Sequence, residues 1–417
     1  MNGRLLRSVL TLMLGSGLAQ GLALAFAPVL TRLYSPEDYA AITLFMALAG
    51  MLLPFACGKY EVAIVVAGTD RQASHLTALS FLVATAVCFV IGLPSIFAWE
   101  STNSLLGSSE LGRWLMAVPV AVLFSAWAMA GRYVANRRSA YRLISQYLLV
   151  QAILSVGLNT LLGFLSWGSN GLIVANLCAV GSGTGWLLWR LRSEMSNACR
   201  TTWLELRTVA HVYREFPLYN ASSTVLDALT LAMPVFFIAR MMSQETLGQY
   251  GFMMRIAQAP LSLIGGAVTQ VHLKHLSDLV RTRQSATPYL RRITALLATI
   301  VIPPSLVLML VAPDLFAFAF GAPWRRAGEL LVIMMPSIAV QFVVSALSPA
   351  CGATGRNRLG AAWKVLAFVA TLGMFVALGS RGESVTTFFV LSTMNVGLYA
   401  VYYACIWYAV RHPRLVA

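Results

Sequence analysis

The chain has 417 residues, of which 58% are hydrophobic and only 11% are charged, and its mean hydropathy is +0.74. Soluble globular proteins carry roughly 25% charged residues, so this composition excludes a water-soluble enzyme or binding domain with an ordinary polar surface. The net charge of +15 does not indicate a nucleic-acid partner, because the arginines fall in short clusters between apolar runs. That pattern is typical of an integral membrane protein.

A membrane-spanning helix needs about 20 predominantly apolar residues. Twelve segments meet this requirement, and their expected ranges are 8–31, 38–66, 73–98, 112–134, 141–165, 170–190, 217–239, 247–272, 288–311, 327–349, 360–379 and 385–410. The first segment ends in Ala23-Leu24-Ala25, which resembles the cleavage site of a signal peptide. We expect a retained helix instead, because the apolar run continues to residue 30 and has a counterpart in the second half.

The distribution of basic residues predicts the orientation. If the N-terminus is cytoplasmic and twelve helices alternate, 22 of the 30 basic residues fall in cytoplasmic segments and six fall on the other face. The remaining two, Lys59 and Arg255, lie inside predicted helices. This asymmetry supports the number of helices and places both termini in the cytoplasm.

The longest connection, 191–216, lies midway along the chain and mixes basic residues with apolar ones such as Trp203 and Leu204. It is compatible with an amphipathic helix in the cytoplasmic interface and with a basic linker between two halves. We therefore expect a six-helix N-terminal lobe over 1–192, a cytoplasmic linker over 193–215 and a six-helix C-terminal lobe over 216–417.

A short pattern occurs twice, at the end of the first and of the seventh predicted helix. Arg32, Ser35, Glu37 and Ala40 recur as Arg240, Ser243, Glu245 and Gly248, each 208 residues later. The shared location in each half favours duplication, and the serine and glutamate of each copy are predicted to cap the following helix. Two parallel six-helix repeats predict lobes related by a pseudo-two-fold axis along the membrane normal.

Four charged residues lie inside predicted spans, where charge is costly and commonly functional. Asp227 is a candidate for a proton relay or for substrate or cation contact, or else for an ion pair with a neighbouring helix. Arg255 suits a bidentate contact with phosphate or carboxylate, or alternatively an ion pair with Asp227 or Glu61. Lys59 and Glu61 both lie late in the second span, and residues at i and i+2 face different ways on a helix.

Uncharged polar residues such as Asn220 also lie in predicted spans, where they form interhelical hydrogen bonds or contact substrate. The six cysteines form no CxxC pair, and the histidines have no carboxylate or thiol at ligand spacing. We therefore expect neither a disulfide framework nor a metal site. The chain has no G-x-x-x-x-G-K-[ST] sequence, so ATP coupling within the chain is not expected and no cofactor is predicted.

The runs 28–39 and 59–64 resemble the first two helices of Wzx-type polysaccharide flippases, which belong to the multidrug/oligosaccharidyl-lipid/polysaccharide (MOP) exporter superfamily. In the second half, Phe216-Pro217, Pro234, 247–250 and Ala259-Pro260 resemble the same family. The resemblance implies an all-α protein of about twelve transmembrane helices, in two six-helix lobes around a central cavity. The resemblance also implies the bacterial inner membrane as its location, with no enzymatic activity.

The resemblance further implies a substrate, undecaprenyl-pyrophosphate-linked oligosaccharide, which is flipped outward by alternating access. Lys59 and Arg255 map to cationic cavity residues of the family, and Glu61 and Asn220 are further candidates for substrate binding. Asp227 is the candidate for ion coupling. The expected partners are the lipid-linked oligosaccharide and membrane lipids, together with a polysaccharide polymerase and a chain-length regulator.

Three other functions remain open at this stage. An ion-coupled multidrug or small-cation antiporter of the same superfamily would use Asp227 without needing Lys59 or Arg255. A membrane-embedded polysaccharide polymerase or ligase would need a sizeable extracytoplasmic loop with catalytic residues, and the longest predicted outer loop, 99–111, is short. A scaffold for polysaccharide assembly would not need charges inside the membrane.

Overall fold

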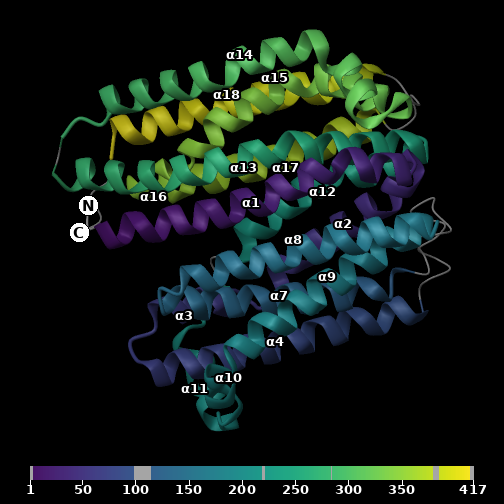
Figure 1. Cartoon of the computed structure of the whole chain (residues 1–417). Coiled ribbons are helices and arrows are strands. Elements are labelled where there is room, and N and C mark those ends of the chain that lie inside the picture. Colours follow the sequence, from purple (N-terminus) through teal and green to yellow (C-terminus); the bar gives the residue numbers. More distant parts are fainter. Residues whose placement is uncertain (1–2, 98–113, 218–220, 283, 379–384, 414–417) are drawn as a thin grey trace. The chain divides into compact units, whose positions relative to one another are not determined.

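The computed structural model describes residues 3–97, 114–217, 221–282, 284–378 and 385–413, and every regular element in these ranges is a helix (Figure 1). The long helices are α1 (Gly3–Leu33), α2 (Pro36–Ala56), α4 (Asp70–Phe97), α7 (Ala117–Arg137), α8 (Tyr141–Phe164), α9 (Gly168–Arg190), α12 (Ala221–Met241), α13 (Gln244–Arg281), α14 (Thr287–Phe320), α15 (Arg325–Leu347), α17 (Asn357–Leu378) and α18 (Val385–Arg411). Each coincides with one predicted span. The predicted all-α membrane protein with twelve long helices is confirmed.

Eleven helices in the described ranges are long and apolar enough to cross a membrane, and α13 is not among them. Its apolar run is interrupted by polar and charged residues, among them Arg255, His272 and Lys274. At 1.5 Å per residue its 38 residues extend over roughly 57 Å. The hydrocarbon layer is only about 30 Å thick. The helix is therefore long enough to span the membrane and to continue beyond it.

The prediction of one continuous helix over 38–66 is wrong. The chain forms α2, which ends at Ala56, and a short helix α3 (Tyr60–Val66). Between them the backbone is left-handed at Gly58, with φ of 57°, and at Lys59, with φ of 62°. Glycine adopts this conformation without steric cost, whereas a residue with a side chain loses roughly 1–2 kcal/mol. The break is therefore favoured at Gly58 and tolerated at Lys59.

Packing divides the chain into two compact units. Unit 1 comprises Met1–Arg240 with Gln244–Gly248, and unit 2 comprises Met241–Ser243 with Gln249–Ala417. The boundary between the units lies at the end of α12, whereas the predicted boundary between the lobes lies before α12 begins. The ranges 1–192, 193–215 and 216–417 therefore stay a prediction.

Unit 1 is built on close contacts between helix backbones. α1 packs along α8, α8 packs against α9, and α2 contacts both α7 and α9. Gly15 permits the first of these contacts, because a Cβ added there would lie 2.3 Å from the Cβ of Ser145. The Tyr34 hydroxyl donates a 2.8 Å hydrogen bond to the Asn159 carbonyl and fixes the end of α1 to α8. Within lipid the hydrophobic effect does not drive helices together. Small residues at such interfaces let the helix backbones approach closely, and van der Waals packing then holds the helices together.

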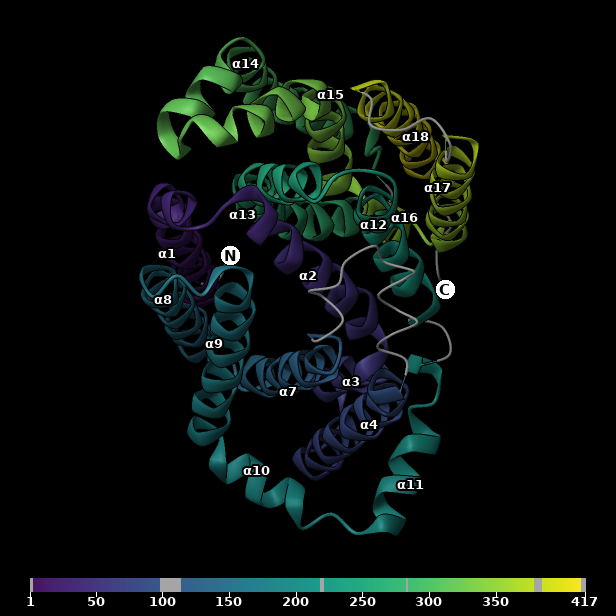
Figure 2. The ribbon, with the colours of Figure 1, turned by 90° about the vertical axis from the view of Figure 1, so that its right-hand side faces the viewer.

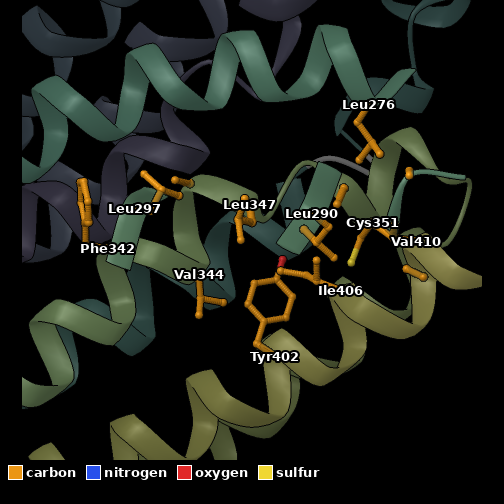
Figure 3. Close-up of a cluster of buried hydrophobic side chains, with 14 of the residues drawn as sticks. Leu276, Leu290, Leu297, Phe342, Val344, Leu347, Cys351, Tyr402, Ile406 and Val410 are labelled. Carbon is orange, nitrogen blue, oxygen red and sulfur yellow. The ribbon is translucent and has the colours of Figure 1, made fainter. Parts of the chain in front are cut away.

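Unit 2 is built around an apolar cluster between α14, α15 and α18 (Figure 3). Leu290 and Leu297 come from α14, Leu347 comes from α15, and Tyr402 and Ile406 come from α18. The Trp363 ring stacks on Tyr402 with ring centres 4.2 Å apart. Its indole N–H also donates a 2.8 Å hydrogen bond to the Leu398 carbonyl. These two contacts attach α17 to α18. The short helices η2 (Ala322–Trp324) and α16 (Ala350–Ala353) complete unit 2.

The helix boundaries repeat the 208-residue offset of the sequence pattern. The same offset separates Leu33 from Met241, which are the last residues of α1 and α12. It also separates Pro36 from Gln244, which are the first residues of α2 and α13. The predicted cap at Ser35 is confirmed, because its Oγ accepts a 3.2 Å hydrogen bond from the N–H of Asp38. The carboxylate that accepts a hydrogen bond from the Ser35 N–H, at 3.0 Å, belongs to Asp38 and not to Glu37. The matched boundaries support an internal duplication.

The connection after α9 folds as two short helices, α10 (Arg192–Cys199) and α11 (Trp203–Val212), which lie beside α4 (Figure 2). An ion pair of 2.6 Å joins Arg71 on α4 to Glu205 on α11. Hydrogen bonds from the Thr202 N–H, from the Arg71 guanidinium and from the Thr202 hydroxyl lower the pKa of Glu205 to about 2. This carboxylate therefore stays ionised at every physiological pH. Val209 is buried and Trp203 is exposed, so α11 is amphipathic.

The contact between α1 and α8 generates a prediction with a control on the same helix. Gly15→Ala forces a Cβ against the backbone and side chain of Ser145, and overpacking of this kind costs about 1–3 kcal/mol. Gly21→Ala meets no atom within 4 Å. Thermal unfolding in detergent should show a lower midpoint for Gly15→Ala and an equal or slightly higher midpoint for Gly21→Ala, because alanine favours a helix more than glycine does. Equal midpoints would contradict the packing described here.

Candidate functional site

The break between α2 and α3 lies deep in unit 1. The Cys57 thiol donates a 3.5 Å hydrogen bond to the carbonyl of Ala126, which lies near the middle of α7. Ala126 is 11 residues from Arg137, the last residue of α7, which is roughly 16 Å along a helix. Non-helical backbone at this depth is tolerated only where protein buries it or where it lines a cavity. Broken helices of this kind form substrate sites in many transporters.

Lys59 and Glu61 lie together at this break. The Lys59 Nζ is 4.0 Å from Glu61 Oε1, and the two side chains are 14% and 1% exposed. The expectation that they face different ways is wrong, because Lys59 precedes α3 in a left-handed conformation and does not belong to a continuous helix. The break thus brings a half-buried cation and a buried carboxylate to the same place.

Some polar atoms in and near this ion pair lack hydrogen-bond partners. Within the part of the chain that the structure describes, Glu61 Oε2 and Arg132 Nε are buried without a hydrogen-bond partner. Tyr133 interacts electrostatically with both Glu61 and Arg132, and the Arg132 guanidinium lies 5.9 Å from the ring centre of Tyr147. Buried polar atoms without partners are rare in proteins. We call Lys59, Glu61, Arg132, Tyr133 and Tyr147 the polar centre.

The polar centre contains two cations and one carboxylate. Its net positive charge suits an anionic group, because a second negative charge would neutralise the set. Lys59 presents a point charge and Arg132 a planar guanidinium, and both bind phosphate oxygens well. Either cation can therefore stabilise a phosphate within a low-dielectric region.

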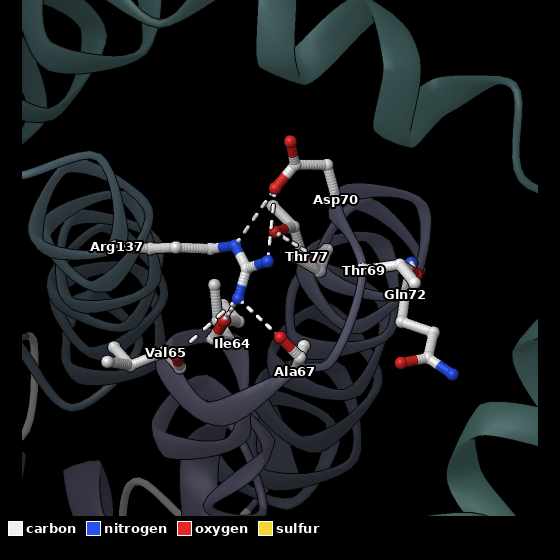
Figure 4. A network of polar contacts seen from close by, with 9 residues as sticks. Ile64, Val65, Ala67, Thr69, Asp70, Gln72, Thr77 and Arg137 are labelled. Carbon is white, nitrogen blue, oxygen red and sulfur yellow. Dashed lines mark hydrogen bonds and ion pairs between the residues drawn. The ribbon is translucent and has the colours of Figure 1, made fainter.

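Arg137 holds the other end of α3 (Figure 4). One guanidinium nitrogen, Nη1, donates to the carbonyls of Ile64, Val65 and Ala67 at 3.2, 3.4 and 2.7 Å. The Nη2 atom donates to Asp70 Oδ1 at 3.0 Å. The last carbonyls of a helix have no partner within it and carry partial negative charge, so a guanidinium stabilises them. Arg137 thereby fixes the position of α3 and of the polar centre at its start.

Sequence reasoning used Arg137 only as a marker of orientation and did not identify it as a positioning residue. Its role depends on the carbonyls of Ile64, Val65 and Ala67, which lie 73, 72 and 70 positions away in the sequence. Arg132 was likewise counted only for orientation, since its partners come from other helices. The Gly58-Lys59 pair was the available signal, because glycine next to a charge in an apolar run is compatible with a helix break.

The other candidate residues lie elsewhere. Asp227 is a half-buried residue of α12 with a polar or electrostatic interaction of its own. Arg255 is an exposed residue of α13 in unit 2. Asn220 lies outside the described residues. The structure thus unites Lys59 with Glu61, and the roles of Asp227, Arg255 and Asn220 stay predictions.

Comparison with known proteins gives a consistent result. A family described as "Polysaccharide biosynthesis protein" matches residues 29–329 of the chain. The succinoglycan biosynthesis transport protein ExoT of Rhizobium meliloti (strain 1021) is 21% identical over 362 residues, which are 86% of this chain and 71% of ExoT.

Two solved structures show the same fold. The lipid II flippase MurJ, in an inward closed conformation, matches with a TM-score of 0.72 at 12% identity, over 97% of this chain and 86% of MurJ. An inward-facing multidrug resistance transporter of the MATE family, a member of the MOP superfamily, matches with a TM-score of 0.69 at 14% identity, over 95% and 93% of the two chains. The chain therefore has the fold of these transporters, which the resemblance to the MOP superfamily implied.

The contacts of Arg137 predict a large difference between two substitutions. Arg137→Gln removes the donors to three carbonyls and should lower stability by about 1–3 kcal/mol. Asp70→Asn removes only the ion pair, and because Asp70 is 98% exposed the loss should be about 0–1 kcal/mol. Thermal unfolding and hydrogen exchange of the amides of 60–67 measure both effects. If Asp70→Asn destabilises as much as Arg137→Gln, the carbonyl contacts are not what positions α3.

Proposed function

The chain belongs to the polysaccharide biosynthesis protein family, and from this premise we propose that it is a flippase for undecaprenyl-pyrophosphate-linked oligosaccharide. It moves this repeat unit of an O-antigen or another surface polysaccharide from the cytoplasmic to the periplasmic leaflet of the bacterial inner membrane. The name of ExoT as a succinoglycan transport protein and that of MurJ as a lipid II flippase support the proposal. Both proteins are named for moving a molecule.

The observation that carries the proposal is the pair of a half-buried Lys59 and a buried Glu61 at the helix break between α2 and α3. A pyrophosphate loses its hydration when it enters the membrane, and a buried cation offsets part of that cost. Lys59 is held by one weak contact to Glu61, with the two charged groups 4.0 Å apart. A phosphate therefore competes with Glu61 for the ammonium group.

The remaining parts of the cycle are assigned to the other candidate residues. Arg255 provides a second contact to the anionic head group, Asn220 contacts the sugar or phosphate, and Asp227 couples alternating access to an ion.

Both termini face the cytoplasm, where the basic residues concentrate. A polysaccharide polymerase and a chain-length regulator receive the flipped repeat unit.

An ion-coupled multidrug or small-cation antiporter is the second candidate, because the MATE transporter has the same fold. The two functions differ in the charge that the site must bind. A cation substrate needs a carboxylate without a resident counter-ion, whereas Glu61 has Lys59 as its neighbour. The polar centre thus favours an anionic substrate.

Genetic complementation tests the role of the cations. In a host from which the gene has been deleted, Lys59→Ala and Arg255→Ala should restore about tenfold less surface polysaccharide than wild type, because each loses a charge-assisted contact to phosphate. Lipid-linked repeat units should accumulate inside the cell. Arg358→Ala, an exposed residue at the start of α17, is the matched control and should restore wild-type levels.

Lys59→Ala leaves the Glu61 carboxylate buried alone, which destabilises a protein strongly. The double variant Lys59→Gln, Glu61→Gln removes both charges and separates folding from function. It should reach wild-type levels in the membrane and still fail to restore the polysaccharide. Full restoration by this variant would contradict the proposed contact with phosphate.

Asp227→Asn tests ion coupling separately. The substitution keeps the size of the side chain and removes its titration, so export of polysaccharide should fall and should lose its dependence on the proton gradient. The rate of appearance of surface polysaccharide, measured with and without an ionophore, reports both effects. Normal export with normal gradient dependence would exclude Asp227 as the coupling residue.

A further inference from the structure

A pocket of about 470 Å³ opens at one end of unit 1, where α8 begins, α9 ends and α10 follows. It is distinct from the polar centre, which lies at mid-depth. The residues that matter for its chemistry are Arg142, Leu143, Gln146, Trp189, Arg190 and Arg192. We call it the three-arginine pocket.

The three arginines of the pocket are not neutralised by carboxylates. On the same face of unit 1, Arg71, Arg137 and Arg138 each form an ion pair, with Glu205, Asp70 and Glu194 respectively. Among the described residues, no carboxylate pairs with any of the three in the pocket. Guanidinium groups gathered around one pocket repel one another, and a bound anion relieves that repulsion.

Aromatic rings orient two of these arginines. The Arg192 guanidinium lies 5.7 Å from the ring centre of Trp189, and the Arg190 guanidinium lies 5.9 Å from that of Trp186. Such contacts restrict long side chains that would otherwise be mobile in water. The forked N–H groups of arginine match phosphate oxygens, so an oriented set favours phosphate over a halide ion.

The position of the pocket indicates that the phosphate belongs to a lipid. Arg142 lies at the start of α8 and Arg190 at the end of α9, so both lie at the depth of the lipid head groups. Trp189 is 58% exposed, and tryptophan concentrates at this depth in membrane proteins. Leu143 adds an apolar wall beside the cations. The preference of basic residues for the cytoplasmic face explains why arginines occur here, but not why three unpaired ones share one pocket.

We propose that the three-arginine pocket binds the phosphate group of an anionic lipid in the leaflet on this face. Two kinds of lipid carry the required group. One is a bulk phospholipid such as phosphatidylglycerol, and the other is a polyprenyl diphosphate of the class to which the proposed substrate belongs. The pocket holds the lipid head group at the membrane surface, apart from the mid-depth site of translocation.

Lipid titration of the purified full-length protein, followed by native mass spectrometry, tests the proposal. The probes are phosphatidylglycerol, undecaprenyl diphosphate and, as an uncharged comparison, phosphatidylcholine. The test variant changes Arg142, Arg190 and Arg192 to glutamine. The control variant changes Arg200, Arg207 and Arg214, which are exposed residues of the following connection, and loses the same three charges.

The expected result is a decrease of about tenfold or more in affinity for at least one anionic lipid in the test variant, with little change in the control. A decrease confined to phosphatidylglycerol identifies a structural phospholipid, and one confined to undecaprenyl diphosphate identifies a capture site for substrate. Equal losses in both variants, or equal binding of phosphatidylcholine and the anionic lipids by wild type, would overturn the proposal. Because translocation is not measured, the result is independent of the proposed function.

Discussion

A membrane interior offers no water to the peptide backbone, and the structure follows from the need to satisfy backbone groups internally. Long helices meet this need almost everywhere in the described ranges. The break at Gly58 and Lys59 interrupts the helical hydrogen bonds, and the chain forms a local turn there. The Arg137 guanidinium binds three carbonyls near the end of α3. A strongly held segment with irregular backbone at mid-depth is costly, and its retention is best explained by function.

The same break places charge where a membrane disfavours it. A continuous helix would have separated Lys59 from Glu61, whereas the left-handed turn places their charged groups 4.0 Å apart, with Glu61 buried and Lys59 half-buried. An anionic head group that crosses the membrane needs such a cation, and the family to which the chain belongs is one of polysaccharide biosynthesis. The fold is shared with drug exporters as well as with a flippase. The polar centre, rather than the fold, therefore distinguishes the proposed substrate.

Much of the architecture could be predicted from the sequence, because apolar runs of sufficient length have few alternatives to a transmembrane helix. All twelve long helices of the described ranges were located, and the offset of 208 residues recurs in their boundaries. The break after Ala56 was missed, since Gly58 and Lys59 sit in a run apolar enough to read as one helix. The role of Arg137 depends on carbonyls about 70 positions away, and no local pattern contains that information.

The most direct test of the central claim is a translocation assay with the purified protein in vesicles. A polyprenyl diphosphate that carries a labelled oligosaccharide is placed in one leaflet, and its appearance in the other is measured by enzymatic removal of the exposed sugar. The account predicts translocation by the wild type, inhibition by excess polyprenyl diphosphate and no transport of organic cations. Absence of translocation together with exchange of cations across the vesicle membrane would contradict it and would identify an antiporter.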